Sequence, residues 1–210
     1  NLTLTSSTLL GGASGWGVNI SSRNRGSVIL STLTVTGARQ GVYVATQTAG
    51  TAVWLTSSTI IASPSGAFNT YGVLLDGLLT GATVQNNAVV WRQAGSQASY
   101  ISYGVGARSS RGLVVRNNRV SDPGVLTDGS WEALSLDDAD DSSLLYNDVH
   151  VTGTGLADAR LLRLLNGSTG ARARGNVFSS SLTVTGSSST VSVDAASQTG
   201  FDADYNDYFS

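Results

Sequence analysis

The chain has no cysteine, no methionine, no lysine and a single histidine, His150, among its 210 residues. Without cysteine it has no disulfide scaffold, no thiolate metal site and no cysteine nucleophile. Without lysine, Schiff-base and P-loop chemistry are excluded, and one histidine excludes any site that needs two. Charged residues make up only 12% of the chain, against about 25% in ordinary globular chains. The longest apolar runs are too short to span a membrane.

The residues that are abundant favour strands and tight turns. The chain contains 25 Gly, 31 Ser and 22 Thr, which are all poor helix formers. Apolar residues make up 40% of the chain, and this content is too high for a disordered segment. The formal net charge of −2 gives no electrostatic reason to expect nucleic acid or an anionic membrane as a partner.

One short pattern recurs along the whole chain at a spacing of about 28 residues, a period typical of solenoid proteins. It consists of an apolar residue, two residues of any type, Ser or Asn, one further residue and a second apolar residue. The central residues are Ser7, Ser31, Ser58, Asn87, Asn118, Asn147, Asn176 and Asn206. We expect them to stack as a ladder at the bend between two strands. Asn tolerates a left-handed backbone at such a bend, and its amide can bond from coil to coil.

A second pattern precedes each central residue: an alternating apolar strand, usually opened by glycine, as at residues 17–20 and 41–44. Alternation indicates half-buried strands. Each repeat therefore holds three short strands and has no room for a crossover helix. Such strands pair by stacking at about 4.8 Å per coil. The sequence predicts an all-β, right-handed parallel β-helix (β-solenoid) of about seven to eight coils, forming one domain over residues 1–210 that we expect to be an excerpt of a longer chain.

The sequence resembles the right-handed parallel β-helix proteins of the pectin-lyase-like superfamily. The resemblance rests on the Asn column, on the Tyr-Gly-Val openings at Tyr71 and Tyr103, and on the closing Asp204-Tyr205-Asn206. It implies a secreted or cell-surface protein with a substrate groove over the first strand of each coil. The superfamily includes polysaccharide lyases, glycoside hydrolases, adhesins and proteins without known activity, so the resemblance does not fix the function.

Three charged residues, Asp76, Arg108 and Asp137, fall at the same position of consecutive coils. The predicted stacking places their Cα atoms about 5 Å apart. The carboxylates could bind a cation or act as acid and base while Arg108 holds a uronate carboxylate. Alternatively, the three side chains form a charge ladder along a solvent-exposed sheet.

The densest acidic run offers a possible Ca²⁺ site. It contains Asp137, Asp138, Asp140 and Asp141, shortly after Trp131. Carboxylate oxygens are the ligands that Ca²⁺ prefers. The run is equally consistent with a solvated turn between two strands, so it predicts either no cofactor or Ca²⁺.

Aromatic residues near the strand openings could form a sugar-binding platform. Trp16, Tyr71 and Tyr103 each precede the glycine of a coil, Trp131 lies near the same position in a further coil, and Arg163 lies on a later strand. Ring faces suit pyranoses, but aromatic residues in half-buried strands also stack on one another.

Two functional hypotheses follow. The first is a non-catalytic secreted or cell-surface module that acts as a structural spacer and binds polysaccharide, neighbouring domains or subunits. The second is a Ca²⁺-assisted lyase, or another carbohydrate-active enzyme, that acts on an acidic polysaccharide through Asp76, Arg108 and Asp137. Charged groups that converge in a groove would favour the enzyme, and a flat charge ladder without a cleft would favour the module.

Overall fold

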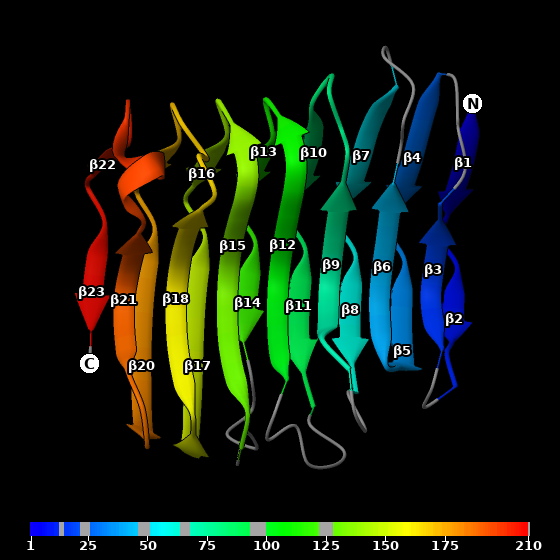
Figure 1. Ribbon diagram of the computed structural model, residues 1–210. Coiled ribbons are helices and arrows are strands. Elements are labelled where there is room, and N and C mark those ends of the chain that lie inside the picture. Colours follow the sequence, from blue (N-terminus) through cyan, green and yellow to red (C-terminus); the bar gives the residue numbers. More distant parts are fainter. Residues whose placement is uncertain are drawn as a thin grey trace.

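The computed structural model describes residues 1–12, 15–21, 26–45, 51–63, 68–92, 100–121 and 128–209. These residues form a parallel β-solenoid in which three parallel sheets surround one core (Figure 1). The predicted all-β solenoid class is confirmed. In the described part of the chain, the one helical segment is the short 3-10 helix η1 (Ala195–Gln198). No helix there is both long and apolar enough to cross a membrane.

Every third strand of the described chain joins the same sheet, and we name the sheets A, B and C. Sheet A contains β1 (Leu2–Thr5), β4 (Ser27–Ser31), β7 (Ala52–Thr56), β10 (Ala82–Gln85), β13 (Val114–Arg116), β16 (Ser143–Leu145), β19 (Arg172–Arg174) and β22 (Asp202–Asp204). Sheet B contains β2 (Thr8–Leu10), β5 (Thr34–Ala38), β8 (Thr59–Ala62), β11 (Ala88–Trp91), β14 (Arg119–Ser121), β17 (Asp148–Leu156), β20 (Val177–Val184) and β23 (Asp207–Phe209). Sheet C contains β3 (Trp16–Ile20), β6 (Gln40–Ala45), β9 (Thr70–Asp76), β12 (Ile101–Arg111), β15 (Ser130–Asp140), β18 (Asp158–Leu165) and β21 (Ser188–Val193).

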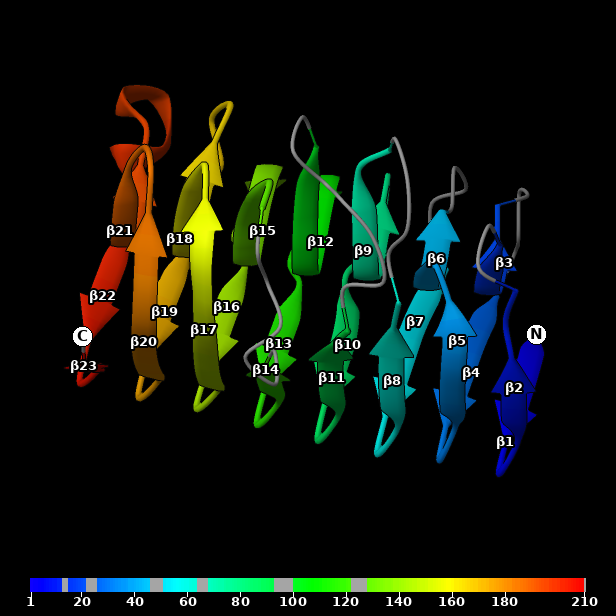
Figure 2. The same cartoon turned by 90° about the horizontal axis from the view of Figure 1, so that it is seen from below.

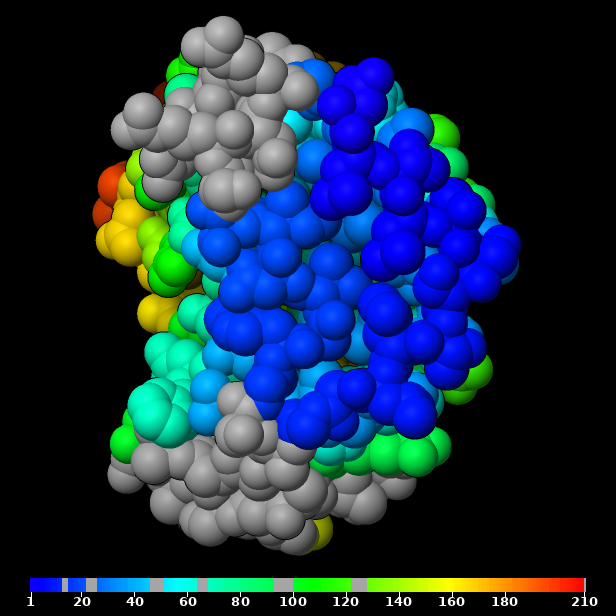
Figure 3. Space-filling model, turned by 90° about the vertical axis from the view of Figure 1, so that its right-hand side faces the viewer, coloured from blue at the N-terminus to red at the C-terminus, as the bar shows by residue number. Residues whose placement is uncertain are grey.

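Each coil passes through sheet A, then sheet B, then sheet C. In Figure 1 the strands of sheet C run upward in front, those of sheets A and B run downward behind, and successive coils advance from right to left. This path is right-handed, the hand that connections between parallel strands favour. Figure 2 shows the same stack from below, with sheet C along one side. Figure 3 looks onto the N-terminal end, where the first coil lies in front of those behind it.

The core consists of the inward residues of all three sheets. In sheet A, Val28 pairs with Val53 and Leu30 with Leu55, and all four side chains are almost fully buried. The side chain between them, Ile29, is only partly buried on the outer face. The alternation read from the sequence therefore places each strand with one face inward.

The predicted ladder forms over most of its length. The Asn147 Oδ1 atom accepts hydrogen bonds from the backbone N–H and the side-chain amide of Asn118, at 3.1 and 3.0 Å. The Asn147 amide donates to the Val115 carbonyl at 2.9 Å and to Asn176 Oδ1 at 3.0 Å. The same pattern continues to Asn206. These buried amides are thus paired both with the backbone and with one another.

Two details of the predicted ladder are wrong. Ser31 lies inside β4, opposite Thr5, and Leu33 occupies the ladder position of that coil. The Leu33 side chain has no hydrogen-bonding atom, so the side-chain ladder begins at Ser58, whose Oγ accepts from the Leu33 N–H at 3.0 Å. Ser7 bonds locally to the Thr5 carbonyl. The left-handed backbone also falls one residue before the ladder, at Ser6, Thr32, Ser57, Asn86, Asn117, Tyr146, Gly175 and Tyr205.

Candidate functional site

The outer face of sheet C carries the three charged residues in the predicted register. Arg108 pairs with Asp76 on β9 and with Asp137 on β15. The Arg108 Nη2 atom donates to Asp76 Oδ2 at 2.7 Å, and the Tyr43 hydroxyl donates to the same oxygen at 3.2 Å. Asp137 Oδ1 instead accepts from the side-chain amide of Asn166 at 2.7 Å. The guanidinium therefore forms an ion pair on one side of the ladder only.

This pairing holds Arg108 in its charged form. The hydrogen bond to Asp76 raises the pKa of Arg108 above its usual value. Burial, followed by the charge of Asp76, raises the pKa of Tyr43. Because both groups keep their protons more firmly, neither is suited to act as a general base at neutral pH.

Two aromatic pairs lie on the same face. Tyr71 and Tyr103, on adjacent strands, stack with ring centroids 4.7 Å apart and planes 9° apart. Trp16 and Tyr43 approach to 4.8 Å with planes 33° apart. Burial raises the pKa of both Tyr71 and Tyr103, and the charge of Glu132 adds to the rise at Tyr103.

Trp131 does not belong to this aromatic surface. Its side chain is 1% exposed and stacks on Trp91 inside the core, with centroids 5.9 Å apart. The outward residue at this point of β15 is Glu132, which pairs with Tyr103. The prediction that Trp131 offers a ring to a sugar is therefore wrong, because the strand turns this side chain inward.

Glu132 is the residue that the sequence analysis missed. Its carboxylate is 1% exposed, accepts a hydrogen bond from Ser135 Oγ at 2.8 Å and forms an ion pair with Arg163. Arg163 pairs in register with Ser135, and its side chain is 28% exposed. Ala133 has no pairing partner on either neighbouring strand, β12 or β18. The alternation of inward and outward side chains along β15 is interrupted at this residue. A strict two-residue alternation could not have placed both Glu132 and Ser135 outward.

Two adjoining cavities open on this face of sheet C. The first, of about 460 Å³, is lined by residues that include Trp16, Tyr43 and Tyr71. The second, of about 210 Å³, is lined by Tyr71 and Tyr103 and extends to Arg108, Asp137 and Glu132. Tyr71 and Arg108 line both cavities. The charged ladder therefore borders a cleft and is not a flat exposed row.

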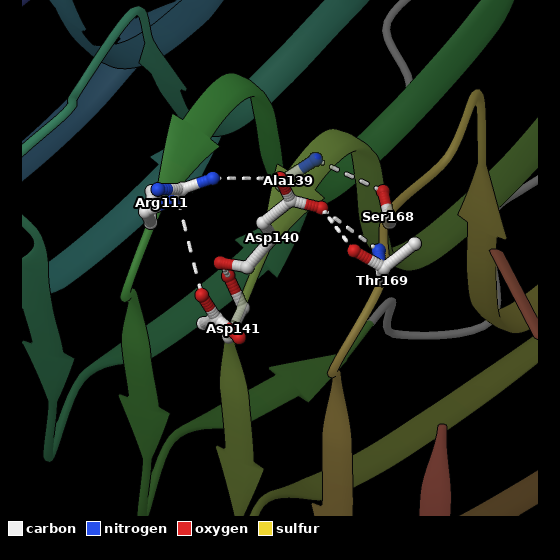
Figure 4. Close-up of polar contacts among 7 residues, drawn as sticks. Arg111, Ala139, Asp140, Asp141, Ser168 and Thr169 are labelled. Carbon is white, nitrogen blue, oxygen red and sulfur yellow. Dashed lines mark hydrogen bonds and ion pairs between the residues drawn. The ribbon is translucent and has the colours of Figure 1, made fainter. Parts of the chain in front are cut away.

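Three of the predicted Ca²⁺ ligands lie in the last part of β15 and Asp141 follows it; Figure 4 shows the contacts of Asp140 and Asp141. Asp140 accepts from the backbone N–H and the hydroxyl of Thr169, at 3.0 and 2.7 Å, and these bonds lower its pKa. Arg111 donates to Asp140 at 3.3 Å and lies 3.9 Å from Asp141. Asp138 is exposed with a positive φ of 52°.

These contacts leave the acidic run without the geometry of a metal site. Asp137 lies on the outer face of sheet C, whereas the Arg111 guanidinium lies beside Asp140 and Asp141. Among the residues that the structure describes, no three Asp, Glu or His side chains are grouped so that they could hold a metal ion. The structure therefore does not bring together the four carboxylates that the sequence suggested for Ca²⁺.

Comparisons with known proteins leave the chain without a matched relative. No protein-family model matches it, and no curated protein or solved structure matches it either. The structure itself defines the class, a parallel β-solenoid with three sheets. The resemblance to the pectin-lyase-like superfamily stays a prediction.

Proposed function

We propose that this protein is a non-catalytic carbohydrate-binding β-solenoid module that holds a glycan chain along the outer face of sheet C. The observation that carries the proposal is the pair of adjoining cavities bordered by rings from four coils. Trp16 and Tyr43 border the first cavity, Tyr103 the second, and Tyr71 both. Aromatic faces combine a large apolar area with a polar tip, which matches the alternating apolar and hydroxyl surfaces of a sugar ring.

The scaffold supports this proposal because it holds the rings at fixed positions. Strands of sheet C repeat about every 4.8 Å, and the Tyr71 and Tyr103 rings are already stacked at 4.7 Å. A preorganised surface loses little conformational entropy when a ligand binds. The proposal includes a secreted or cell-surface location and a role as a rigid spacer towards neighbouring domains or subunits, and the location rests on the sequence resemblance.

The second candidate is a Ca²⁺-assisted lyase, and one observation favours it: Arg108 and Asp137 line the same cavity. A lyase of this kind needs Arg108 to accept a proton from the substrate. The bond to Asp76 acts in the opposite direction, since it raises the pKa of Arg108. We therefore place binding ahead of catalysis.

The test is calorimetric titration with neutral, acidic and amino-sugar oligosaccharides. For a glycan that binds, Tyr71→Ala should weaken the affinity by at least about tenfold, or about 1.4 kcal/mol. The matched control is Tyr205→Ala, because Tyr205 is exposed at the bend that joins sheets A and B, away from both cavities. The proposal fails if no oligosaccharide binds, or if Tyr205→Ala weakens binding as much as Tyr71→Ala does.

A further inference from the structure

The charges around the second cavity do not cancel. Arg108 pairs with Asp76 at 2.7 Å, and Arg163 pairs with Glu132. Asp137 lines the cavity, and its polar contact is the neutral amide of Asn166. In the described part of the chain, no arginine lies within ion-pair distance of Asp137. The charged residues that line the cavity are Arg108, Glu132 and Asp137. Arg108 and Glu132 each have an ion-pair partner outside this lining, so the negative charge left over belongs to Asp137.

Two aromatic rings also line the cavity. Tyr71 and Tyr103 are stacked, and both line the cavity that Asp137 lines. Burial is the main cause that raises the pKa of both tyrosines. The Arg108 charge opposes the rise at Tyr71, and the Asp137 charge adds to the rise at both rings. Ring faces carry negative electrostatic potential and attract ammonium groups. A carboxylate and two aromatic rings around one space favour a cation and disfavour an anion.

Gly106 leaves the floor of this cavity open. A Cβ atom at Gly106 would lie 3.6 Å from the nearest atoms of Leu74 and Tyr71, an ordinary contact distance. At Gly104 a Cβ atom would lie only 2.5 Å from the Ala133 carbonyl oxygen, so the fold itself requires that glycine. No such requirement exists at Gly106. The resulting space of about 210 Å³ is smaller than the ~300–1,000 Å³ of typical drug-sized sites, and it suits a single ring of a longer chain.

From these features we infer that the second cavity binds the protonated amine of a sugar ring, so that the ligand is an unacetylated amino-sugar polymer. The inference rests on the proposed glycan binding along sheet C. The ammonium group pairs with Asp137 while the ring lies against Tyr71 and Tyr103. A uronate would bring a third carboxylate near Asp137 and Glu132, and Arg108 already has its partner. This reverses the expectation that Arg108 holds a uronate.

The experiment is calorimetry with four oligosaccharides of equal length: glucosamine, N-acetylglucosamine, cello- and galacturonate oligomers. At mildly acidic pH the glucosamine oligomer should bind at least about tenfold more tightly than the other three. Added salt should reduce this preference. Asp137→Asn should remove the preference by lowering the affinity for the glucosamine oligomer to that for the neutral cello-oligomer. The control, Asp148→Asn, removes the same charge from an exposed position of β17 in sheet B and should change neither affinity.

The outcomes separate this inference from the proposed function. If the cello-oligomer binds and Tyr71→Ala removes that binding, but Asp137→Asn leaves the glucosamine affinity unchanged, the amine inference is overturned and the glycan-binding proposal stands. If none of the four binds, both fail. An oligolysine peptide that binds as tightly as the glucosamine oligomer would overturn the assignment to a sugar. Gly106→Leu fills the cavity without touching the charges, and it should abolish glucosamine binding even if Asp137→Asn folds poorly.

Discussion

The guanidinium of Arg108 bonds to Asp76, 2.7 Å away on the preceding strand, and not to Asp137 on the following strand. Both carboxylates lie in direct register with Arg108. The Tyr43 hydroxyl donates to the same Asp76 oxygen and is a second donor at that side. The two carboxylates therefore differ: Asp76 is paired with a guanidinium group, whereas Asp137 lines the second cavity without an ion-pair partner.

We expect Asp76→Asn to release Arg108 and to change the ligand preference of the groove. The Arg108 side chain is 46% exposed, so loss of the ion pair should change the free energy of unfolding by no more than about 1 kcal/mol. The affinity for an acidic oligosaccharide should rise, because the guanidinium then lacks a carboxylate partner. Calorimetry with oligogalacturonate measures this change. The matched control is Asp202→Asn, which releases Arg174 on sheet A and should give no gain.

We expect Asn147→Ala, in the centre of the Asn ladder, to lower the free energy of unfolding strongly. It removes bonds to Asn118, Val115 and Asn176 in a buried environment. Each buried group left without a partner costs about 1–3 kcal/mol, so the free energy of unfolding should fall by about 3 kcal/mol. Urea denaturation measures it. The control is Ser7→Ala, which removes only a local bond to Thr5 and should lower the free energy of unfolding by less than about 0.5 kcal/mol. Equal losses in the two variants would show that the Asn ladder does not stabilise the fold.

The two glycines of β12 should respond in opposite ways to alanine. In Gly104→Ala the new Cβ would lie 2.5 Å from Ala133 O and Val120 Cγ1, and such overpacking costs about 1–3 kcal/mol. Gly106→Ala meets only ordinary contacts and should leave stability unchanged or raise it by up to about 1 kcal/mol, because alanine restricts the unfolded chain. Thermal unfolding of both variants tests this contrast, and a marked loss in Gly106→Ala would show that Gly106 is needed by the fold.

Stability should fall at alkaline pH through the tyrosines of the groove. Burial raises the pKa of Tyr103 above that of a free tyrosine. Below about pH 10 both the folded and the unfolded state keep this proton, so the contribution is constant there. As the pH rises further, the unfolded state loses its proton first, and the free energy of unfolding decreases. Tyr103→Phe should flatten this decrease in urea titrations at increasing pH, whereas Tyr146→Phe, at an exposed position, should leave it unchanged.

The repeat made most of the fold predictable, but it assigned Ser31 to the ladder, where the structure has Leu33. The residues from Val28 to Leu33 match the sequence pattern of the ladder with Ser31 at its centre. In the structure Val28 pairs with Leu2 and Leu30 with Leu4, which places Leu33 at the bend. The predicted register differs by two residues and would keep the same faces inward, but it would place Val28 opposite Leu55 and Gly26 opposite Val53. The observed register instead packs Val28 on Val53 and Leu30 on Leu55, so more apolar side chains meet in the core. In a stretch rich in Ser and Thr, the polar pattern alone could not make this choice.

The candidate site was predictable only in part, for a related reason. The period predicted that Asp76, Arg108 and Asp137 occupy the same position on consecutive coils. The strand register confirms this placement. Trp131 was expected on the outer face and Glu132 was missed, because a strict alternation does not allow for the break at Ala133 within β15. An irregularity within a strand shifts every outward position before it, and no local preference of the sequence marks its place.

The parallel stacking, the three-strand repeat and the apolar core could be predicted from the sequence alone, because they depend on a period and an alternation that each segment carries locally. Which charges neutralise each other and which side chains share a cavity became clear only from the folded chain. Arg108 and Asp76 are 32 residues apart, and their contact depends on how side chains from neighbouring coils turn toward one another. The free negative charge of Asp137 and the open floor at Gly106 are properties of that packing, since each is defined by neighbours from other coils.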